Sequence, residues 1–375
     1  MTDIVIEGVM DIRRRKTRQI QVGNVKIGGD APVVVQSMTT TDTKNIDATV
    51  AQINRLEEAG CEVVRIAVPE SEAAEAAGEI KKQVKLPIVA DVHYDHRLAL
   101  MVMERGIDCI RINPGNIGSR QKVERVVKMA KERKVPMRIG VNAGSLEKDL
   151  LEKYGYPTAE AMVESAIKHI RILEDLDFFD IKVSLKASNV KLAVDAYRLF
   201  SKQLDYPLHL GITEAGLLLP GSIKSAIGMG LLLSEGIGDT IRVSLATEPE
   251  EEVKVGYEIL KALELRHHGI NIIACPTCGR LEIDLFKLAN EVEQRLAHVK
   301  EPINISLLGC IVNGIGEGKE SDIGIAGGKG QGILFKHGEM IRKIQESEMA
   351  DVLVAEVEAM VLEKKNGKKE KKHSK

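Results

Sequence analysis

The feature that most constrains the fold is an alternation of two patterns between residues 33 and 263. A short run of β-branched and apolar residues is followed by a polar break and then by an amphipathic stretch such as 46–60 or 119–133. Eight strands alternating with helices predict an α/β fold of the (β/α)8 TIM barrel type. A doubly wound open sheet is the alternative, but eight regular units fit closure better. The strand-like runs are 33–38, 61–68, 87–93, 108–115, 136–145, 180–188, 207–216 and 240–246.

This pattern ends after the eighth helical stretch, which covers about residues 250–263. We therefore expect a TIM-barrel domain over residues 1–264, with an N-terminal extension over 1–30, and a smaller α+β domain over 265–363. The last twelve residues, KKNGKKEKKHSK, form a run of like charges. Such a run is typical of a solvated end, so a disordered Lys-rich tail is predicted over residues 364–375.

The smaller domain shows its own order of elements. A helix is predicted over 281–299, then a strand over 303–309, a glycine-rich loop, one or two further strands and a final helix near 346–363. The first of these helices has apolar residues at steps of three and four, which indicates a core face. They are Leu281, Leu285, Leu288, Val292 and Leu296.

The composition excludes several classes of function. Lys and Arg number 53 against 55 Asp and Glu, giving a net charge of −2, and aromatic residues make up 3% with no Trp. These values argue against nucleic-acid binding by bulk electrostatics or base stacking. No segment approaches the roughly 20 apolar residues that span a membrane, and the N-terminus lacks a secretory signal. We therefore expect a cytoplasmic protein, in which the five cysteines serve metal binding or catalysis before disulfides.

Five of the predicted strands carry a cation within an otherwise apolar run. A charge buried against the helix layer is costly without a partner, whereas one near the carboxyl end of a barrel strand lies where barrel active sites form. Each cation could pair with a local carboxylate, but five converging cations repel one another unless a polyanion joins them. A diphosphate fits, since guanidinium groups match its oxygens. The cations are Arg65, Arg111, Arg138, Lys186 and Arg242.

Polar side chains occur at the same strand ends. Glu214 beside a cationic cluster fits either a counter-ion or a proton donor. A single histidine at a strand end is as often structural as functional. The polar residues are His93, Asn113, Asn142, Thr213, Glu214 and Ser244.

Three cysteines indicate a metal site in the smaller domain. Cys275 and Cys278 form a C-x-x-C step just before the predicted helix, whose amino end favours thiolates. Cys310 follows the next predicted strand. A structural zinc site would need a fourth Cys or His ligand, for which His267 or His268 is available.

The loop after Cys310 offers oxygen ligands instead: Asn313, Glu317, Glu320 and Asp322. A carboxylate beside three thiolates is more consistent with an iron–sulfur cluster, because an oxygen ligand is hard and exchangeable. Such a site would combine Lewis-acid and electron-transfer chemistry. We therefore favour the cluster over zinc.

Nine segments spread over nearly the whole chain carry a specific resemblance: QSMTTTDT, ADVHYD, RINPGN, RIGVNAGSL, SLKAS, GITEAG, IRVSL, CPTCGR and GCIVNGIGEG. They resemble the 4-hydroxy-3-methylbut-2-enyl diphosphate synthases of the methylerythritol phosphate route to isoprenoids. The resemblance implies a TIM barrel joined to a 4Fe–4S domain in a compact two-domain chain. It also implies reductive ring opening and dehydration of 2-C-methyl-D-erythritol 2,4-cyclodiphosphate. The electrons would come from reduced flavodoxin or ferredoxin.

The resemblance assigns roles to individual residues. The cluster ligands would be Cys275, Cys278, Cys310 and Glu317, and the acid near the leaving oxygen would be Glu214. The residues that would bind the substrate are Arg65, His93, Arg111, Arg138, Asn142, Lys186, Thr213, Arg242 and Ser244.

Barrel geometry adds an expectation about assembly. Each barrel helix returns the chain to the bottom of the barrel, so the chain near residue 264 lies on the order of 20 Å below the cations. The linker LRHHGIN reaches at most about 24 Å and must also round the barrel. We therefore expect a homodimer in which each cluster domain caps the partner's barrel, as the resemblance also implies.

Two rival functions come from other classes. One is a barrel transferase or hydrolase for a phosphorylated or pterin-like ligand, with a structural zinc module. The other is a binding scaffold without chemistry. A brown, iron-containing protein would separate the cluster enzyme from both rivals.

Overall fold

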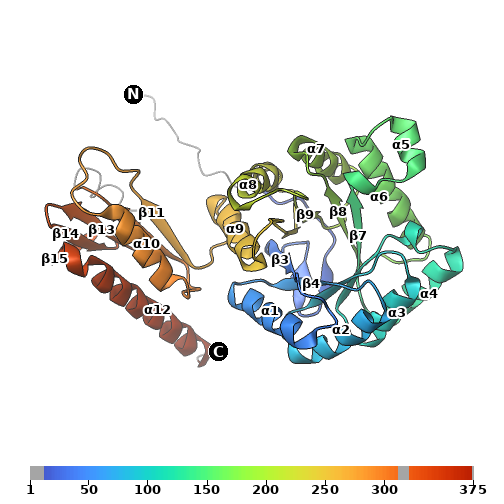
Figure 1. The fold of residues 1–375 in the computed structure, drawn as a ribbon, viewed down its shortest axis with the longest axis horizontal. Coiled ribbons are helices and arrows are strands. Elements are labelled where there is room, and N and C mark those ends of the chain that lie inside the picture. Colours follow the sequence, from blue (N-terminus) through green and yellow to red (C-terminus); the bar gives the residue numbers. More distant parts are fainter. Residues whose placement is uncertain (1–11, 311–320, 374–375) are drawn as a thin grey trace. The chain divides into compact units, whose positions relative to one another are not determined.

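The computed structural model describes residues 12–310 and 321–373. The chain divides into two compact units, residues 1–266 and 267–375, which are described separately (Figure 1). The division falls beside the boundary that the change of sequence pattern indicates.

Within the described residues of the first unit, eight strands form one parallel sheet in the order β8-β7-β6-β5-β4-β3-β10-β9. An isolated parallel bridge between Val183 and Leu208 joins the two ends of this order, so the sheet comes near to a closed ring. The prediction of a (β/α)8 barrel is confirmed. The strands are β3 (Val34–Met38), β4 (Val63–Ala67), β5 (Ile88–Asp91), β6 (Cys109–Arg111), β7 (Met137–Asn142), β8 (Ile181–Lys186), β9 (His209–Leu210) and β10 (Thr240–Ile241).

Helices follow the strands and cover the outside of the barrel (Figure 1). Several begin at side chains that cap the free backbone N–H groups, such as Asn45, Asp95, Thr158 and Asn189. The helices are α1 (Ile46–Glu58), α2 (Ser71–Gln83), α3 (His96–Glu104), α4 (Arg120–Arg133), α5 (Lys148–Tyr154), α6 (Ala159–Glu174), α7 (Val190–Ser201), α8 (Leu218–Ser234) and α9 (Pro249–Ala262).

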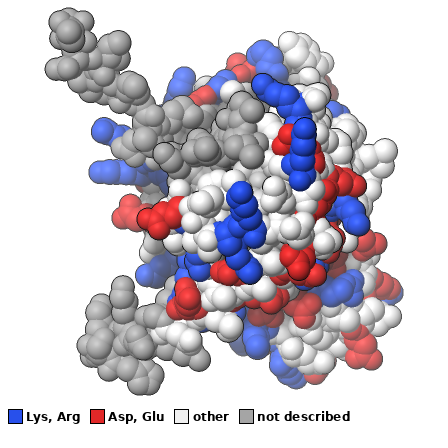
Figure 2. Space-filling view, turned by 90° about the vertical axis from the view of Figure 1, so that its left-hand side faces the viewer, with Lys and Arg blue, Asp and Glu red and all other residues white. Residues whose placement is uncertain are grey.

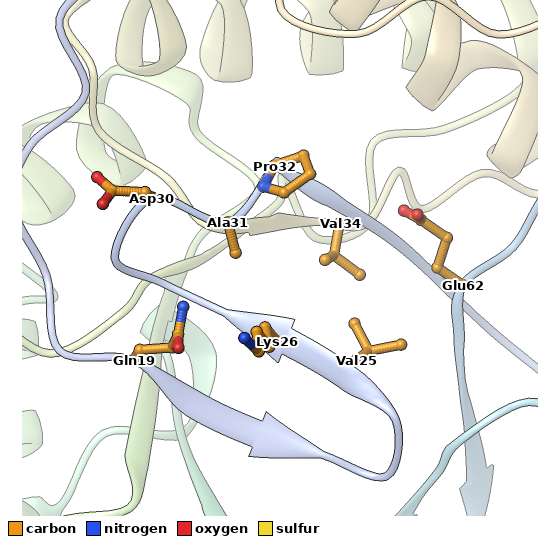
Figure 3. A pocket seen from close by; sticks show the side chains of 8 residues that line it. All are labelled: Gln19, Val25, Lys26, Asp30, Ala31, Pro32, Val34 and Glu62. Carbon is orange, nitrogen blue, oxygen red and sulfur yellow. The ribbon is translucent and has the colours of Figure 1, made fainter. Parts of the chain in front are cut away.

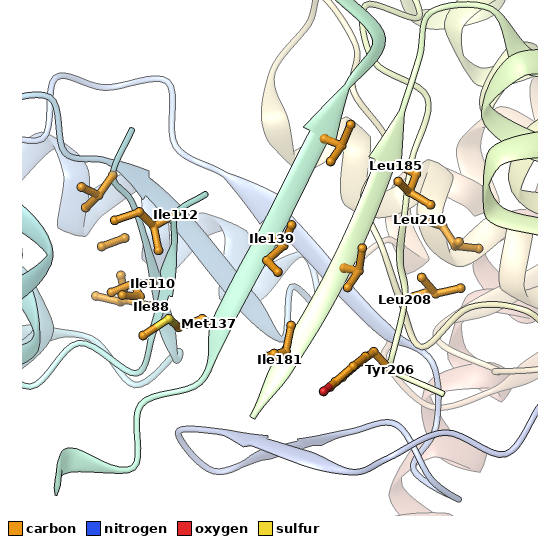
Figure 4. Close-up of a cluster of buried hydrophobic side chains, with 14 of the residues drawn as sticks. Ile88, Ile110, Ile112, Met137, Ile139, Ile181, Leu185, Tyr206, Leu208 and Leu210 are labelled. Atoms are coloured by element: carbon orange, nitrogen blue, oxygen red, sulfur yellow. The ribbon is translucent and has the colours of Figure 1, made fainter. Parts of the chain in front are cut away.

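The strands separate an apolar layer from a polar lumen because successive side chains point to opposite faces. On β7, Met137, Ile139 and Val141 join the core between strands and helices. Arg138 and Asn142 have the opposite parity and therefore face the lumen. Figure 4 shows members of this core on neighbouring strands, among them Ile139 and Leu185.

A hairpin closes the N-terminal end of the lumen. It consists of β1 (Ile20–Val22) and β2 (Val25–Ile27), paired antiparallel. Its apolar residues pack against the first lumen-facing residues of four strands, which are Val34, Val63, Val89 and Cys109. This apolar floor leaves the carboxyl ends of the strands as the end at which polar lumen residues gather.

The second unit contains, in its described part, a five-stranded sheet in the order β11-β12-β13-β14-β15. The first three strands run parallel, and β14 pairs antiparallel with both β13 and β15. Two helices, α10 (Leu285–Leu296) and α12 (Met349–His373), share one apolar core with this sheet. The strands are β11 (Ile270–Ala274), β12 (Ile303–Leu308), β13 (Ile323–Gly328), β14 (Gln331–Lys336) and β15 (Glu339–Gln345).

Three details differ from the sequence predictions for this unit. α10 begins at Leu285, because Asp284 caps it by accepting from the backbone N–H of Lys287, and Leu281 therefore lies outside the helix and is exposed. The segment LRHHGIN, expected to be a linker, includes the first two residues of β11 at its end. α12 continues to His373, through the segment predicted to be a disordered tail. Lys and Glu favour helix, and a helix that has already formed lengthens at little cost.

The surface carries charges of both signs. On the face seen in Figure 2, Lys and Arg side chains are interspersed with Asp and Glu over the described residues. Among the residues described, no helix is both long and apolar enough to cross a membrane.

Candidate functional site

The structure brings all five predicted strand cations into the barrel lumen. Arg65, Arg111, Arg138 and Lys186 lie on β4, β6, β7 and β8, and Arg242 follows β10 directly. Arg111, Arg138 and Lys186 are each less than 10% exposed, and the side chains of Arg65 and Arg242 are about 15% exposed. We call these five residues the cation belt.

Strand register places members of the belt side by side. Arg111 pairs with Arg138 across β6 and β7, and Arg138 pairs in turn with Lys182 across β7 and β8. Burial, and then the charge of Arg111, lower the pKa of Arg138 to about 10. Burial and the neighbouring arginines likewise lower the pKa of Lys186. Burial and mutual repulsion therefore both disfavour the charged forms of these side chains.

Asp91 is the lumen carboxylate that faces the belt within the described chain. Its oxygens lie 3.8 Å from Arg65 Nε, 3.5 Å from Arg111 Nη1 and 3.6 Å from His93 Nε2. Burial alone would raise the pKa of Asp91, but the hydrogen bond with His93 and the arginine charges outweigh it and hold this pKa below its usual value. Glu252 lies beside Arg242, but two carboxylates cannot neutralise five cations, so the belt retains a net positive charge.

Two glycines make room for the belt. A Cβ atom at Gly140 would lie 2.8 Å from Arg111 Nε, and one at Gly211 would lie 2.7 Å from Lys186 Nζ. Gly140 also accepts a hydrogen bond from Arg111 Nη2 at 3.0 Å through its carbonyl oxygen. The absence of a side chain at these two positions therefore allows the cations to lie against the barrel wall.

Arg242 is positioned from the outer side of the barrel. Its Nε lies 3.5 Å from Glu252 Oε2 on α9, and the same carboxylate accepts from Ser37 Oγ at 3.0 Å. Met38 lies between two belt members, with its sulfur 2.9 Å from Arg65 Nε and 3.7 Å from Arg242 Nη1.

The predicted polar residues lie around the mouth of the barrel. His93 is about half exposed and its ring hydrogen-bonds Arg111 Nη1 at 3.0 Å. Asn142, Thr213 and Ser244 are partly buried at or just after the ends of β7, β9 and β10.

Glu214 lies on the loop after β9 and is exposed. Its backbone φ is 52°, in the left-handed region that residues other than glycine adopt rarely. Such strain is found disproportionately at functional sites, and here it accompanies the carboxylate predicted to transfer a proton.

Sequence reasoning missed several buried polar residues in the lumen, among them Lys182, His209 and Asp91. Lys182 is fully buried on β8, and its Nζ lies 3.5 Å from Gln36 Oε1. His209 is also fully buried, and its Nδ1 lies 2.6 Å from Thr240 Oγ1. Strand parity could have identified Lys182, because it lies four residues before Lys186 and so points to the same face. Asp91, inside the ADVHYD segment, could also have been identified by strand parity, because it lies two residues after the lumen-facing Val89 on β5.

The segments that carry the three predicted cysteine ligands follow neighbouring strands at one end of the second sheet. Cys275 follows β11 and Cys310 follows β12, and these strands are parallel neighbours. The backbone N–H of Cys275 donates to Leu307 O at 3.0 Å, and that of Glu282 donates to Gly309 O at 3.0 Å. The loop bearing Cys278 is thereby tied to the strand that leads to Cys310.

The chemistry of this edge fits a thiolate-bound group. Hydrogen bonds from the backbone and side chain of Arg280 lower the pKa of Cys278, which favours its thiolate. The charges of all three cysteines in turn contribute to a raised pKa of Arg280, after its hydrogen bond with Cys278. Glu317 lies outside the described residues, and among those described no three His, Cys, Asp or Glu side chains are close enough to hold a metal ion.

The two histidines of the zinc alternative lie elsewhere in this unit. His267 and His268 precede β11, whereas Cys275 follows it. A five-residue strand spans roughly 16 Å, which separates these histidines from the cysteine edge. The arrangement therefore disfavours a histidine as the fourth ligand.

A separate pocket lies at the opposite end of the barrel from the belt. It has a volume of about 390 Å³ and lies between the β1–β2 hairpin and β3, lined in part by Gln19, Lys26, Asp30 and Glu62 (Figure 3). Its mixed charges contrast with the cationic lumen.

Two solved structures resemble this chain weakly. A sialic acid synthetase from Leptospira borgpetersenii is 13% identical, with a TM-score of 0.49, over 76% of this chain and 98% of that one. The Yersinia pestis dihydropteroate synthase is 14% identical, with a TM-score of 0.48, over 66% of this chain and 97% of that one. Likeness at this level carries no argument about function.

Sequence relatives are much closer. A family profile described as the GcpE TIM-barrel domain matches residues 17–257, and one described as the GcpE protein C-terminal domain matches residues 271–359. A protein from Geobacter sulfurreducens named 4-hydroxy-3-methylbut-2-en-1-yl diphosphate synthase (flavodoxin) is 61% identical over 94% of this chain and 99% of its own length. One of the same name from Geobacillus thermodenitrificans is 60% identical over 96% of each chain. This chain belongs to the GcpE family, that of the 4-hydroxy-3-methylbut-2-en-1-yl diphosphate synthases.

Proposed function

We propose that this chain is an iron–sulfur oxidoreductase that converts 2-C-methyl-D-erythritol 2,4-cyclodiphosphate to 4-hydroxy-3-methylbut-2-enyl diphosphate in the cytoplasm. The observation that carries the proposal is the cation belt, in which five buried or partly buried cations meet only two carboxylates, Asp91 and Glu252, among the described residues. A buried cluster of this kind is costly unless an anion joins it. A cyclic diphosphate carries two negative groups at a spacing that several guanidinium forks can bind together.

In this proposal the belt binds the diphosphate and the mouth binds the carbon skeleton. Arg65, Arg111, Arg138, Lys186 and Arg242 hold the phosphate oxygens. His93, already hydrogen-bonded to Arg111, orients that guanidinium. The hydroxyl and amide groups of Asn142, Thr213 and Ser244 lie at the strand ends, where they can reach the ring oxygens and hydroxyls.

Glu214 is the proposed acid. The reaction opens one C–O bond of the ring and removes a hydroxyl as water, which consumes two electrons and two protons. Glu214 lies at the mouth on the loop after β9 and is exposed. Its carboxyl oxygen can therefore hold a proton and pass it to the leaving oxygen.

Cys275, Cys278, Cys310 and Glu317 are the proposed ligands of one 4Fe–4S cluster. When bound, the cluster supplies electrons singly to the substrate. In support, Arg280 hydrogen-bonds Cys278 and interacts by charge with all three cysteines. The relatives' names specify flavodoxin; we propose reduced flavodoxin as the electron donor here, with ferredoxin as the alternative.

We further propose a homodimer that shares its sites between chains. Arg266, the last residue of the first unit, donates to Val33 O at 2.8 Å and pairs with Glu62 at 2.9 Å. Val33 and Glu62 precede β3 and β4, so the chain leaves the barrel at the end opposite the belt. Because the linker starts at that end, we propose that the cluster domain of the partner chain serves this belt.

A surface suited to the second copy lies on α8. Leu219, Ile223, Ile227 and Leu231 recur every four residues and are 44–73% exposed. A continuous apolar stripe of this kind marks an interaction surface. In a closed two-fold dimer the same stripe would contact itself.

Anaerobic purification followed by an activity assay tests the function. Protein reconstituted with iron and sulfide should be brown, bind about four irons per chain, and form the allylic diphosphate when given reduced flavodoxin and the cyclic diphosphate. A colourless zinc protein would instead support a transferase or hydrolase with a structural zinc module. A brown protein that binds no cyclic diphosphate would contradict the role of the belt.

A further inference from the structure

A buried amine lies beneath the cation belt without a carboxylate partner among the described residues. Lys182 is 0% exposed, and the hydrogen bond found for its Nζ is to Gln36 Oε1 across the lumen, at 3.5 Å. A buried cation normally requires an opposite charge, because the loss of hydration is large. The residue is therefore held where its charge is unfavourable.

The groups around Lys182 are cations or neutral. Arg138 is its cross-strand neighbour on β7, and Arg65 on β4 also lowers its pKa by charge repulsion. Cys109 on β6 is a neutral thiol at ordinary pH, since burial raises its pKa. His209 on β9 is neutral too, because burial and the charges of Lys186, Arg138 and Lys182 lower its pKa. Gln36 on β3 carries no charge.

These surroundings make the pKa of Lys182 sensitive to any charge that is added at the cation belt. Burial, followed by the charge of Arg138, lowers the pKa of Lys182 from 10.5 to about 8. A dianion bound on the belt would add negative charge on the same side as the arginines that repel the ammonium group. Because protein of low dielectric constant lies between the belt and Lys182, the attraction between the bound dianion and the ammonium group would be screened only weakly.

Resting on the proposed function, we propose that Lys182 takes up a proton when the cyclic diphosphate binds, so that this residue tunes substrate affinity without touching the substrate. The proton comes from solvent and remains on Nζ while the dianion is bound. The substrate does not compete for it, because each of its phosphate groups has a single acidic hydroxyl that is already ionised at neutral pH. Affinity should therefore decline as the pH rises above about 8.

Lys186 must be separated from this effect, because burial also lowers its pKa and it belongs to the belt. Lys182→Met removes the titrating group while keeping an unbranched side chain of similar length. Lys182→Arg keeps a permanent charge at the same place. Lys128→Met, on the exposed face of α4, is the matched control. Lys186 is unchanged in all three variants, so its own proton uptake cancels in the comparison.

The test is calorimetric titration of the oxidised holoenzyme with 2-C-methyl-D-erythritol 2,4-cyclodiphosphate, in buffers of different ionisation enthalpy, at pH 7.0 and 8.5. At pH 8.5 the wild type and Lys128→Met should take up roughly 0.5–0.8 proton more than Lys182→Met and Lys182→Arg. At pH 7.0 this difference should nearly vanish. Between pH 7.5 and 9 the affinity of the wild type should fall several-fold more than that of Lys182→Arg.

Proton uptake at pH 8.5 that is the same in the wild type, Lys182→Met and Lys182→Arg would overturn the role of Lys182 while leaving the proposed function intact. Failure of every form, including the wild type, to bind the cyclic diphosphate would overturn the proposed function and this inference with it. If Lys182→Met does not fold, the comparison of the wild type with Lys182→Arg decides the question alone.

Discussion

Arg111 and Arg138 are direct neighbours across β6 and β7, and both face the lumen with less than 10% of their surface exposed. Two guanidinium groups in this position repel each other and are poorly hydrated. Nε and Nη1 of Arg138 have no hydrogen-bond partner in the described part of the chain. We infer that an anion bound in the lumen would supply the missing acceptors.

Replacing Arg138 by Met should therefore weaken substrate binding without destabilising the fold. We expect the free energy of unfolding to stay the same or rise, because a buried and unpaired cation is removed. Affinity for the cyclic diphosphate should fall by about 2 to 5 kcal/mol. Thermal denaturation and calorimetric titration measure the two effects, with Arg125→Met on the exposed face of α4 as control. A variant that loses stability but keeps its affinity would show that Arg138 is structural.

Lys182→Met should stabilise the fold in a pH-dependent way. The pKa of Lys182 is lowered from 10.5 to about 8 in the folded chain, so its charge opposes folding below about pH 8. That penalty disappears as the pH rises from about 8 to 10.5, where the unfolded chain also loses the proton. We expect the variant to gain on the order of 2 kcal/mol at pH 7 and little at pH 10.5. Urea unfolding at both pH values checks this, and an equal gain at both would contradict the titration.

Glu214→Gln should separate binding from turnover. The amide keeps the size of the side chain but cannot donate a carboxylic proton, so kcat should fall by roughly 100-fold or more. Substrate affinity should change by less than threefold, because Glu214 is exposed and lies outside the belt. Retained turnover would assign the proton to another group and leave Glu214 as a counter-ion.

Complementation between two inactive chains tests the shared site. A chain with Cys275→Ala lacks a cluster ligand, and one with Arg242→Ala lacks a belt cation. A mixed dimer, isolated by two different tags, should regain about half of the wild-type activity, because the barrel of the first chain meets the cluster domain of the second. If each parent folds but the mixed dimer stays inactive, the site is built within one chain.

Much of this arrangement follows from local sequence pattern. Period-two alternation on β7 suffices to assign Met137 and Ile139 to the helix layer and Arg138 to the lumen. The same parity places Lys182 on β8 in the lumen, four residues before Lys186. Consecutive parallel strands also predict that Arg111 and Arg138 are neighbours.

Other features depend on closure of the barrel or on competing local structure. The contact between Lys182 and Gln36 joins β8 to β3 across the lumen, and its existence depends on how the strands are staggered around the ring. The start of α10 was predicted too early because the apolar step at Leu281 outweighed the cap at Asp284. Residues 364–375 were predicted to be disordered from their charge alone, whereas Lys and Glu also favour helix, and α12 continues to His373.

The most direct test of the central claim is the crystal structure of the full-length holoenzyme with 2-C-methyl-D-erythritol 2,4-cyclodiphosphate, prepared without reductant so that the substrate persists. We predict both phosphate groups inside the lumen, with oxygens within about 3 Å of at least three of Arg65, Arg111, Arg138, Lys186 and Arg242. Substrate bound elsewhere, for example in the pocket between the N-terminal hairpin and β3, with no phosphate oxygen near the belt cations, would contradict the account.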